Sequence, residues 1–457
     1  MESAAALSQR SSRLTWLAVA LATGVCALLA TVGADARWLA ALGATIVRTH
    51  SIPDGVPYAA ASSAHWVNVP VLGELAFHAF ESLGGDRGLL LAQVVAVALA
   101  FALLALDMRA AVAPDASRAI VLVAVLFAAA PSLIVARSQL FSLVLFPALL
   151  LLVRSEARRR SPRVWLLVPL IALWSNLHGA VLAGLAVAAA YLLLHRLRSD
   201  PAVAITVLLA SVAALFLTPA LARTGEYYVG VLHSEAARRG DGMWAPLSVH
   251  APFDVLFVVV AVPLVMLALR SRLPRWELVC LVALAVSSIH VSRNSVWLAM
   301  FIAVPAACGL GRTRLRDVVP SQIVVVACAV VPVLLFVVGI ARTPSANVAG
   351  TTLRDRAVSL AHGTPILADD ADAEQLALDG HRVWIANPLD AFDRRDQLLY
   401  LEWLDGTAPG DRVLDRDARV VLVMRDSPSQ RRLARDASFR SVGRDETSVL
   451  YVRTGTS

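Results

Sequence analysis

Long apolar runs, separated by short polar segments, dominate the first 341 residues of the chain. About eleven of these runs approach the roughly 20 residues that a helix needs to cross a bilayer. They lie at 14–33, 88–106, 119–136, 138–153, 164–178, 180–195, 202–219, 254–269, 276–291, 295–311 and 320–341. The pattern therefore predicts a mainly α-helical protein, a polytopic membrane bundle of about 11 transmembrane helices.

Two breaks between runs depend on single arginines. The third and fourth runs form one apolar stretch that is interrupted only by Pro131 and Arg137. Because an ionised arginine is costly at the centre of a bilayer, Arg137 predicts a turn at a water-facing surface. Arg293 and Asn294 separate the ninth and tenth runs in the same way.

The pattern changes at Arg342, where apolar residues no longer form long runs. Short strands alternate there with helical stretches, which predicts a small α/β domain with a largely parallel sheet. The strands are expected at 365–368, 382–386, 419–424, 438–443 and 448–453, and the helices at 372–379, 393–405 and 428–436. The chain thus divides into a transmembrane domain, 1–341, whose first outer loop covers 34–86, and a second domain, 342–457.

Composition agrees with a membrane protein. The chain is 58% hydrophobic and only 16% charged, whereas about a quarter of the residues of soluble proteins are charged. The net charge of +7 does not indicate a nucleic-acid partner, because most of the arginines lie in loops between apolar runs.

The distribution of arginine also predicts the orientation. Arginines gather in alternate loops, at 154–163, 196–198, 270–275 and 312–316. The positive-inside rule places these loops and the N-terminus in the cytoplasm. With an odd number of helices, the first loop, the 220–252 loop and the C-terminal domain are then extracytoplasmic.

The first outer loop is too long for a simple turn, and long loops beside a scaffold commonly carry function. Asp35 follows the first apolar run directly. Partial desolvation at that depth raises the pKa of a carboxyl group and suits a general base. The alternative is a solvated carboxylate at the membrane boundary.

Glu74 and His78 are four residues apart in a segment with helical periodicity, so they share one helix face. They are candidates to orient a hydroxyl group or to hold one side of a divalent cation. The alternative is an ordinary side-chain pair on a helix surface. No third ligand completes a metal site locally, so the cofactor stays unknown and no metal ligand is assigned.

A second group of polar residues lies at the predicted outer ends of the helices. Two arginines that converge there would suit a phosphate or pyrophosphate, which guanidinium groups bind in a bidentate manner. The candidate substrate-binding residues are Arg137, Gln139, Trp174, Asn176, His178, Arg293 and Asn294. As alternatives, the arginines extend to the interface, and Asn176 and His178 bond neighbouring helices.

Three further segments have a structural explanation as well as a functional one. Residues 226–243 are either a lid over the cavity or a surface helix. The acidic patch 369–374 precedes a predicted helix, where acids favour the helix dipole, and that explanation suffices. The segment 380–406 is rich in Trp, Tyr and Asp, as sugar-contacting surfaces are, but no chemistry is assigned to it.

Taken together, D-x-x-W in Asp35–Gly43, the stretch Ile52–Leu75, R-x-Q-L-F-S in Arg137–Ser142 and W-x-N-L-H-G in Trp174–Gly179 resemble a known family. These motifs are similar to those of bacterial polytopic GT-C glycosyltransferases related to the dolichyl-phosphate-mannose protein mannosyltransferases. The resemblance implies an enzyme of the inner membrane with a polyprenyl-phosphate-linked sugar donor and membrane lipids as partners. It also implies that Asp35 deprotonates an acceptor hydroxyl at the outer face, while Arg137 and Arg293 neutralise the leaving phosphate.

The chain departs from that family at Gly33 and Leu39, where relatives often carry an acid and a histidine, and Glu74 is displaced from the usual position. A second hypothesis is therefore a non-catalytic scaffold or envelope-assembly protein that presents the C-terminal domain. A transporter is a third, but it would need broken helices or an inverted repeat, and the sequence shows neither.

Overall fold

The structure is a computed structural model, and it describes residues 12–240, 242–313, 322–342, 348–415 and 418–454. The chain divides into two compact units. We call them the helical unit (Met1–Thr31, Leu90–Thr218 and Gly242–Thr343) and the mixed unit (Val32–Leu89, Pro219–Asp241 and Pro344–Ser457). The first outer loop, 34–86, thus groups with the C-terminal stretch, whereas the expected boundary near residue 342 stays a prediction.

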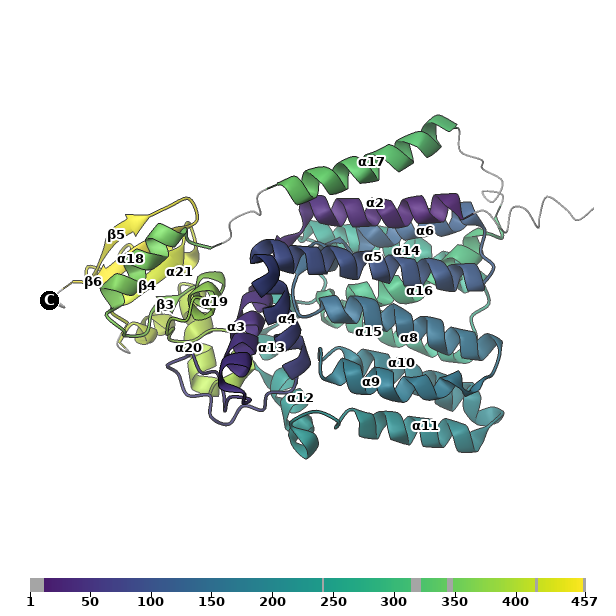
Figure 1. Cartoon of the computed structure of the whole chain (residues 1–457), viewed down its shortest axis with the longest axis horizontal. Helices are drawn as coiled ribbons and strands as arrows, with labels where there is room; N and C mark the ends of the chain where they lie inside the picture. The colour runs from purple at the N-terminus through teal and green to yellow at the C-terminus, as the bar shows by residue number, and fades with distance from the viewer. Residues whose placement is uncertain (1–11, 241, 314–321, 343–347, 416–417, 455–457) are drawn as a thin grey trace, which may run out of the picture. The chain divides into compact units, whose positions relative to one another are not determined.

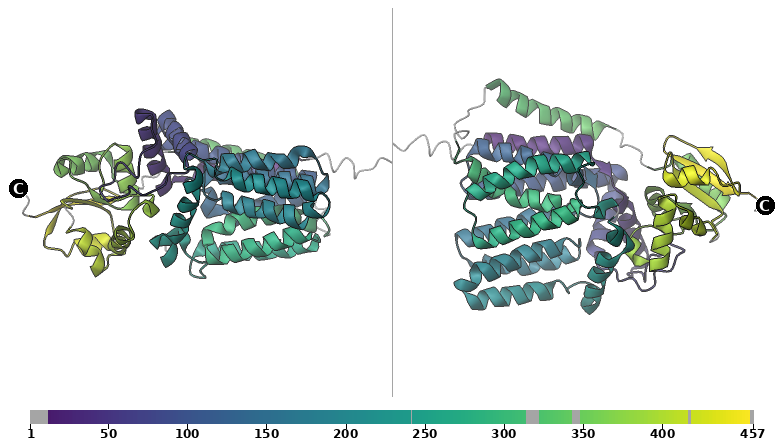
Figure 2. Two further views of the ribbon diagram at one scale, coloured as in Figure 1. Left: turned by 90° about the horizontal axis from the view of Figure 1, so that it is seen from below. Right: turned by 180° about the vertical axis from the view of Figure 1, so that it is seen from behind.

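The helical unit consists of helices that run side by side (Figures 1 and 2). They are α2 (Arg13–Leu29), most of α5 (Asp86–Ala110), α6 (Asp115–Ala128), α7 (Ala130–Leu133), α8 (Leu140–Arg158), α9 (Leu167–Ser175), α10 (Val181–Leu194), α11 (Pro201–Ala214), α14 (Pro252–Arg270), α15 (Arg275–His290), α16 (Ser295–Leu310) and α17 (Gln322–Ala341). Short 3₁₀ turns connect some of them: η1 (Pro162–Leu166), η2 (Arg196–Arg198), η4 (Gly242–Trp244) and η5 (Ser292–Asn294).

A helix overlaps each apolar run that the sequence predicts to span the membrane. Within the described residues, five helices are long and apolar enough to cross a bilayer: Asp86–Ala110, Leu140–Arg158, Val181–Arg198, Pro252–Arg270 and Ser292–Leu310. Four more apolar helices are shorter: Arg13–Leu29, Pro162–Ser175, Pro201–Ala214 and Val330–Ala341. The chain is therefore a multi-pass membrane protein, and the figure of about 11 spans remains a prediction.

Both breaks that arginines predict are confirmed. Arg137 lies between strand β2 (Val135–Ala136) and α8, and β2 pairs with β1 (Thr31–Val32) in a two-stranded sheet. Arg293 and Asn294 lie in η5, between α15 and α16. Because helix α9 ends at Ser175, His178 belongs to a connecting segment rather than to a span.

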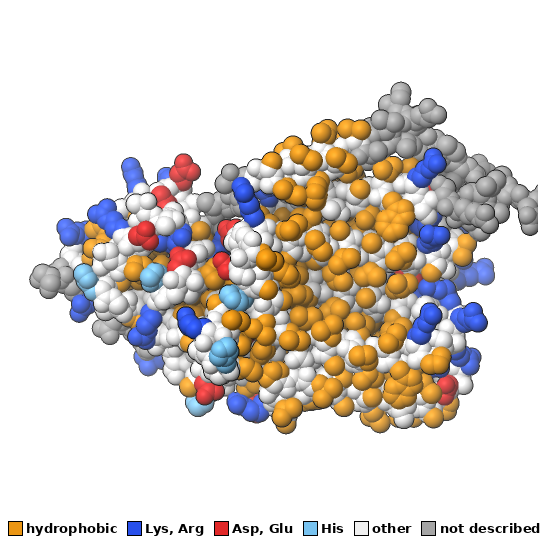
Figure 3. Space-filling view, viewed as in Figure 1, with side chains coloured by type: hydrophobic (Ala, Val, Ile, Leu, Met, Phe, Trp, Pro, Cys, Tyr) orange, Lys and Arg blue, Asp and Glu red, His pale blue; other side chains and the backbone are white. Residues whose placement is uncertain are grey.

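Packing within the helical unit separates inner from outer helices. In the apolar stretch of α16, 78% is buried inside the protein, whereas in that of α14 only 22% is buried. A helix that is apolar all round and buried forms a core, whereas one that exposes its apolar side chains suits contact with lipid. The space-filling view shows hydrophobic side chains along these helices and arginines gathered at one end of them (Figure 3).

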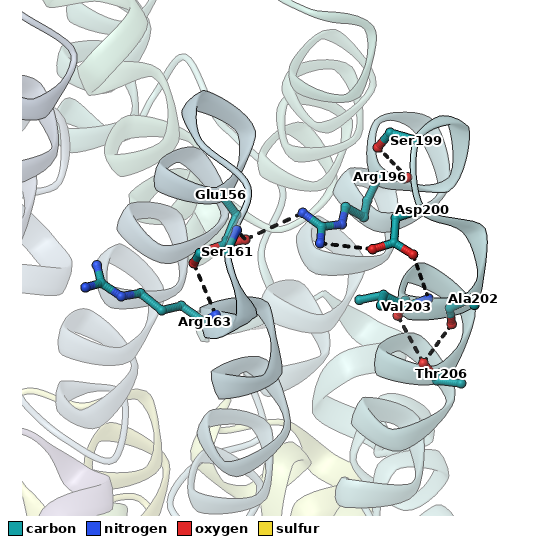
Figure 4. Close-up of polar contacts among 9 residues, drawn as sticks. All are labelled: Glu156, Ser161, Arg163, Arg196, Ser199, Asp200, Ala202, Val203 and Thr206. Atoms are coloured by element: carbon teal, nitrogen blue, oxygen red, sulfur yellow. Dashed lines mark hydrogen bonds and ion pairs between the residues drawn. The ribbon is translucent and has the colours of Figure 1, made fainter.

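Some arginines that the sequence assigns to inner loops are paired with acids. Arg154 is buried and binds Glu277 (Nε–Oε1 2.8 Å) and Asp107 (Nη1–Oδ2 3.2 Å). Arg196 lies between Glu156 (3.7 Å) and Asp200 (3.3 Å), as Figure 4 shows. These arginines therefore also connect helices. Residues 314–321, which include part of the last predicted inner loop, lie outside the described residues.

Asp200 also explains where α11 begins. Its side chain accepts a hydrogen bond from the backbone N–H of Val203 at 3.4 Å, and Pro201 occupies the first helical position (Figure 4). An acidic cap followed by proline is a common start of a helix. The same carboxylate thus caps one helix and pairs with the end of the preceding segment.

The mixed unit combines loop segments with the C-terminal stretch. Its helices are α3 (Ala34–Thr49), α4 (Val71–Gly84), α12 (Thr224–His233), α13 (Glu235–Arg239), α18 (Thr351–Ala361), α19 (Asp370–Leu378), α20 (Arg394–Leu404) and α21 (Pro428–Leu433), with turns η3 (Leu221–Arg223), η7 (Leu389–Ala391) and η8 (Ala408–Val413). The three helices predicted after residue 370 are thereby confirmed.

One sheet lies in the C-terminal stretch, in the order β3-β4-β6-β5. Its strands are β3 (Leu367–Ala368), β4 (Val420–Met424), β5 (Phe439–Arg444) and β6 (Ser448–Arg453). Only β3 and β4 are parallel, while β4–β6 and β5–β6 are antiparallel. The expectation of a largely parallel sheet is wrong, because the connection between β5 and β6 is too short for the crossover that parallel strands require.

The strand expected at 382–386 is also absent from the described part of the sheet. Val383 forms only single bridges, to Ala59 and to Ile366. The apolar side chains of this stretch are buried as the pattern indicates. Its backbone bridges two other segments at single positions only.

Candidate functional site

Two arginines and a histidine from distant parts of the chain meet in the helical unit. Burial, together with the charges of Arg293 and Arg137, lowers the pKa of His178 from 6.5 to about 3. Both guanidinium groups therefore lie within electrostatic reach of one imidazole ring. That these two arginines and His178 form one binding site stays a prediction.

Hydrogen bonds determine which nitrogen of His178 carries the proton. The backbone N–H of Ala180 donates to Nδ1 at 3.2 Å, so Nδ1 is an acceptor. The Ser142 hydroxyl lies 2.7 Å from the same nitrogen and accepts a bond from Trp174 Nε1, also at 2.7 Å. The consistent assignment is a neutral ring protonated at Nε2, with Ser142 donating to Nδ1.

Trp174 is held in place by a glycine on the next helix. A Cβ atom at Gly184 would lie 2.4 Å from the Trp174 ring, so only glycine allows this approach. Trp174 is fully buried. The chain from Trp174 through Ser142 to His178 is therefore rigid, and it presents a neutral N–H donor beside two cations.

The remaining candidates of this unit differ in what they contact. Arg293 stacks on the ring of Trp244, 3.7 Å from its centroid. Asn294 donates to Ser287 Oγ (2.9 Å), and Asn176 donates to the carbonyl oxygens of Ala172 and Leu217 (both 2.8 Å). These amide bonds match the interhelical alternative. Gln139 is buried at the start of α8.

Asp35, the candidate base, belongs to the mixed unit. It lies in the first turn of α3 and is half-buried. Arg37, two residues later on the same helix, is fully buried and binds Asp86 (Nη2–Oδ2 2.9 Å). An acid in the first turn of a helix interacts favourably with the helix dipole, which is consistent with either reading of Asp35.

Asp35 is surrounded by carboxyl groups that the sequence did not connect to it. Helix α19 packs against α3. Burial is the main cause that raises the pKa values of Asp370, Glu374 and Asp390, and the charge of Asp35 is a smaller contribution in the same direction; for Asp390 the resulting pKa is about 6. Asp35 is thus the half-exposed member of a group of acids that are otherwise pushed toward their neutral forms.

The other acids of the patch 369–374 have structural partners. Asp369 accepts bonds from Met424 N and Ser429 Oγ, and Asp372 accepts from Ala349 N (2.6 Å) and Ser448 Oγ (2.7 Å). The dipole explanation is consistent with Asp370 and Asp372, which lie in the first turn of α19. The dipole explanation does not account for the hydrogen bonds by which Asp369 and Asp372 connect the start of α19 to other segments.

Glu74 is fully buried in α4. Asn68 Nδ2 donates to its Oε2 at 2.9 Å, yet burial raises the pKa of Glu74 to about 8. The backbone of α3 approaches closely, since a Cβ atom at Gly43 would lie 2.2 Å from the Glu74 carbonyl oxygen. Glu74 is therefore a buried, protonated acid at neutral pH, and its geometry favours a positioning role over direct catalysis.

Metal binding finds little support in the part of the chain that the structure describes. There, no group of three or more His, Cys, Asp or Glu residues is arranged to hold a metal ion. The pair Glu74 and His78 thus gains no third ligand among the described residues.

The loop after α11 is docked within the mixed unit. The backbone N–H of Glu235 donates to Gln397 Oε1 at 2.9 Å, and the Glu235 carboxylate pairs with Arg394. Arg239 binds Glu402 and Asp405 on or just after α20. Helix α13 is therefore tied to α20 rather than lying free on the surface.

A cavity of about 170 Å³ opens beside α12 in the same unit. Asp390, to which the sequence assigned no chemistry, lines this cavity. The available signal was the aromatic and acidic composition of 380–406, which also fits a core. Only the fold shows that Trp66, more than 300 positions earlier, donates its indole N–H to Asp390 Oδ2 at 3.2 Å.

Known proteins resemble this chain in fold rather than in sequence. No protein-family model matches the chain, and no curated protein does. The crystal structure of ArnT from Cupriavidus metallidurans bound to undecaprenyl phosphate does match, with a TM-score of 0.54 over 96% of this chain and 98% of that chain, at 15% sequence identity. At this identity the match shows the fold alone: the chain has the GT-C-like membrane fold that its motifs predict.

Proposed function

We propose that the protein is a membrane glycosyltransferase that transfers a sugar from a polyprenyl-phosphate-linked donor to an acceptor hydroxyl at the outer face of the membrane. The observation that carries the proposal is the GT-C-like fold, and the charges of Arg137 and Arg293 that act on the buried ring of His178 support it. The fold supports it, because the similar ArnT structure holds undecaprenyl phosphate.

The helical unit binds the donor phosphate in this proposal. Guanidinium groups form charge-assisted, bidentate bonds to phosphate oxygens. The Nε2–H of His178 adds a neutral donor without adding charge repulsion. When the bond between the sugar and the phosphate breaks, negative charge develops on the leaving phosphate, and pre-positioned cations stabilise that charge.

Asp35 accepts the proton of the acceptor. In the mechanism that the family resemblance implies, the acceptor oxygen attacks the anomeric carbon as its O–H proton passes to the Asp35 carboxylate, and the bond to the phosphate breaks in the same inverting displacement. The half-exposed side chain of Asp35 remains accessible to an acceptor, unlike buried Glu74. Glu74 supports the loop that carries this chemistry.

The test uses the full chain in nanodiscs with radiolabelled polyprenyl-phosphate sugars and measures donor binding and sugar transfer separately. Arg137→Ala and Arg293→Ala are expected to weaken donor binding, while Asp35→Asn keeps donor binding and loses transfer. Arg163→Ala is the matched control, because Arg163 is exposed and its side chain points away from the ion pairs around it (Figure 4). Transfer by Asp35→Asn at the wild-type rate would remove the base from the mechanism.

The scaffold hypothesis has a different signature in the same assay. If the wild-type chain binds no polyprenyl-phosphate donor, and the two arginine variants behave like Arg163→Ala, the enzyme proposal fails. The C-terminal stretch would then be the working part of the molecule.

A further inference from the structure

The cavity beside α12 is built from three separate segments of the mixed unit. The first outer loop contributes residues 62–67, helix α12 contributes one face, and residues 390–393 close the remaining wall. Segments that are far apart in sequence meet here and enclose about 170 Å³. A small concave site with a few converging polar groups is the usual form of a ligand pocket.

Aromatic rings and carboxylates both line this cavity. Trp66 and Tyr227 are half-buried, Phe392 is buried, and all three line it. Aromatic rings present flat apolar faces, and Trp and Tyr add polar edges, so they suit ligands that are apolar on one face and hydroxylated at the rim.

Asp390 is the acid best placed to bind such a ligand. The indole N–H of Trp66 donates to Oδ2 at 3.2 Å and thereby orients the carboxylate. A carboxylate has about four acceptor positions, so this bond leaves room for ligand hydroxyl groups. Burial raises the pKa of Asp390 to about 6, and the group is still mostly ionised at pH 7.5.

The charge of the lining restricts the ligand further. Glu226, Asp390 and Asp393 all line the cavity, as does His65, and no arginine occurs among the described residues that line it. Glu226 also pairs with Arg223 (Nε–Oε2 3.1 Å). Like charges across a binding site are unfavourable, so phosphorylated and acidic sugars are disfavoured. Hydroxyl and amino groups, in contrast, donate to carboxylates in strong charge-assisted bonds.

We propose that this cavity binds one sugar ring of the acceptor, a neutral or aminated pyranose, with Asp390 accepting from its hydroxyl groups and Trp66 and Tyr227 contacting its apolar face. The assignment to the acceptor rests on the proposed function. The proposal that the cavity binds a sugar is independent of the proposed function.

Saturation-transfer NMR on the full chain in nanodiscs tests the site. The probes are methyl α-mannoside, methyl glucosaminide and mannose 6-phosphate, and labelled undecaprenyl phosphate is measured in parallel. The wild type is expected to bind the first two probes and not the phosphorylated sugar. Asp390→Asn should weaken sugar binding roughly tenfold, as the loss of a bond to a charged group predicts, and leave lipid binding unchanged.

Two further cavity variants and one control test the site independently of Asp390→Asn. Trp66→Phe removes only the N–H that orients Asp390, and Tyr227→Ser removes a ring, so both should weaken sugar binding even if Asp390→Asn does not fold. Glu446→Gln is the matched control, because Glu446 is exposed and does not line the cavity. Unchanged sugar binding in the folded cavity variants, or equal binding of mannose 6-phosphate, overturns the proposal.

The design separates this inference from the proposed function. Sugar binding that depends on Asp390, in a wild-type chain that binds no polyprenyl phosphate, would refute the glycosyltransferase and keep the sugar site. Competition by undecaprenyl-phosphate mannose, but not by undecaprenyl phosphate, would assign the cavity to the donor sugar and overturn its assignment to the acceptor.

Discussion

Replacement of Glu74 by glutamine should remove a loss of folding stability that occurs in the mixed unit as the pH rises. Glu74 is fully buried, and burial raises its pKa from 4.5 to about 8. In the unfolded chain the group loses its proton near pH 4.5, whereas in the folded chain it keeps it until about pH 8. Between these values the folded state binds more protons, so the free energy of unfolding falls as the pH rises.

The size of the effect follows from the width of this window. Each pH unit is worth about 1.4 kcal/mol, so the loss approaches about 5 kcal/mol above pH 8 as an upper limit. Glu74→Gln keeps the side-chain volume and an oxygen that accepts from Asn68 Nδ2, but it does not ionise. We expect the variant to match the wild type near pH 4 and to exceed its stability increasingly toward pH 8.

Thermal melting of the purified protein in detergent, from pH 4 to 9, measures the difference between the two proteins. The difference is needed because Asp369 and Asp390, with pKa values raised by burial to about 7 and about 6, also titrate in this range. Glu81→Gln, on the same helix α4, is the matched control. Parallel wild-type and Glu74→Gln melting curves across the whole range would refute the reasoning.

Two further predictions concern the helical unit. Asp107→Asn removes the ion pair of Asp107 with Arg158 and leaves Arg154 paired with Glu277, so we expect a loss of about 3–5 kcal/mol, read as a lower Tm in detergent. An unchanged Tm would show that these pairs add no stability. Gly184→Ala forces a Cβ into the Trp174 ring, which should cost about 1–3 kcal/mol and weaken donor binding. Gly225→Ala is its control because no atom lies within 4 Å of the added Cβ, and equal donor binding by the two variants would contradict the role of Trp174.

The sequence by itself determined the elements of the helical unit. Apolar runs of spanning length can only be satisfied as buried or lipid-facing helices, so their positions follow from local pattern. Arg137 and Arg293 mark turns for the same reason, since a charge is excluded from the middle of a span. The GT-C-like fold was accessible through short motifs, and the match to ArnT confirms it.

Tertiary structure decided what local pattern does not encode. Strand direction in the C-terminal sheet depends on which strands become neighbours, and the short β5–β6 connection made the pairing antiparallel. Burial likewise separated two acids that both lie in the first turn of a helix, leaving Asp35 half-exposed and Glu74 enclosed. The pairing of Trp66 with Asp390 joins residues whose separation in the chain carries no periodic signal, because such contacts arise only when the folded chain brings distant segments together.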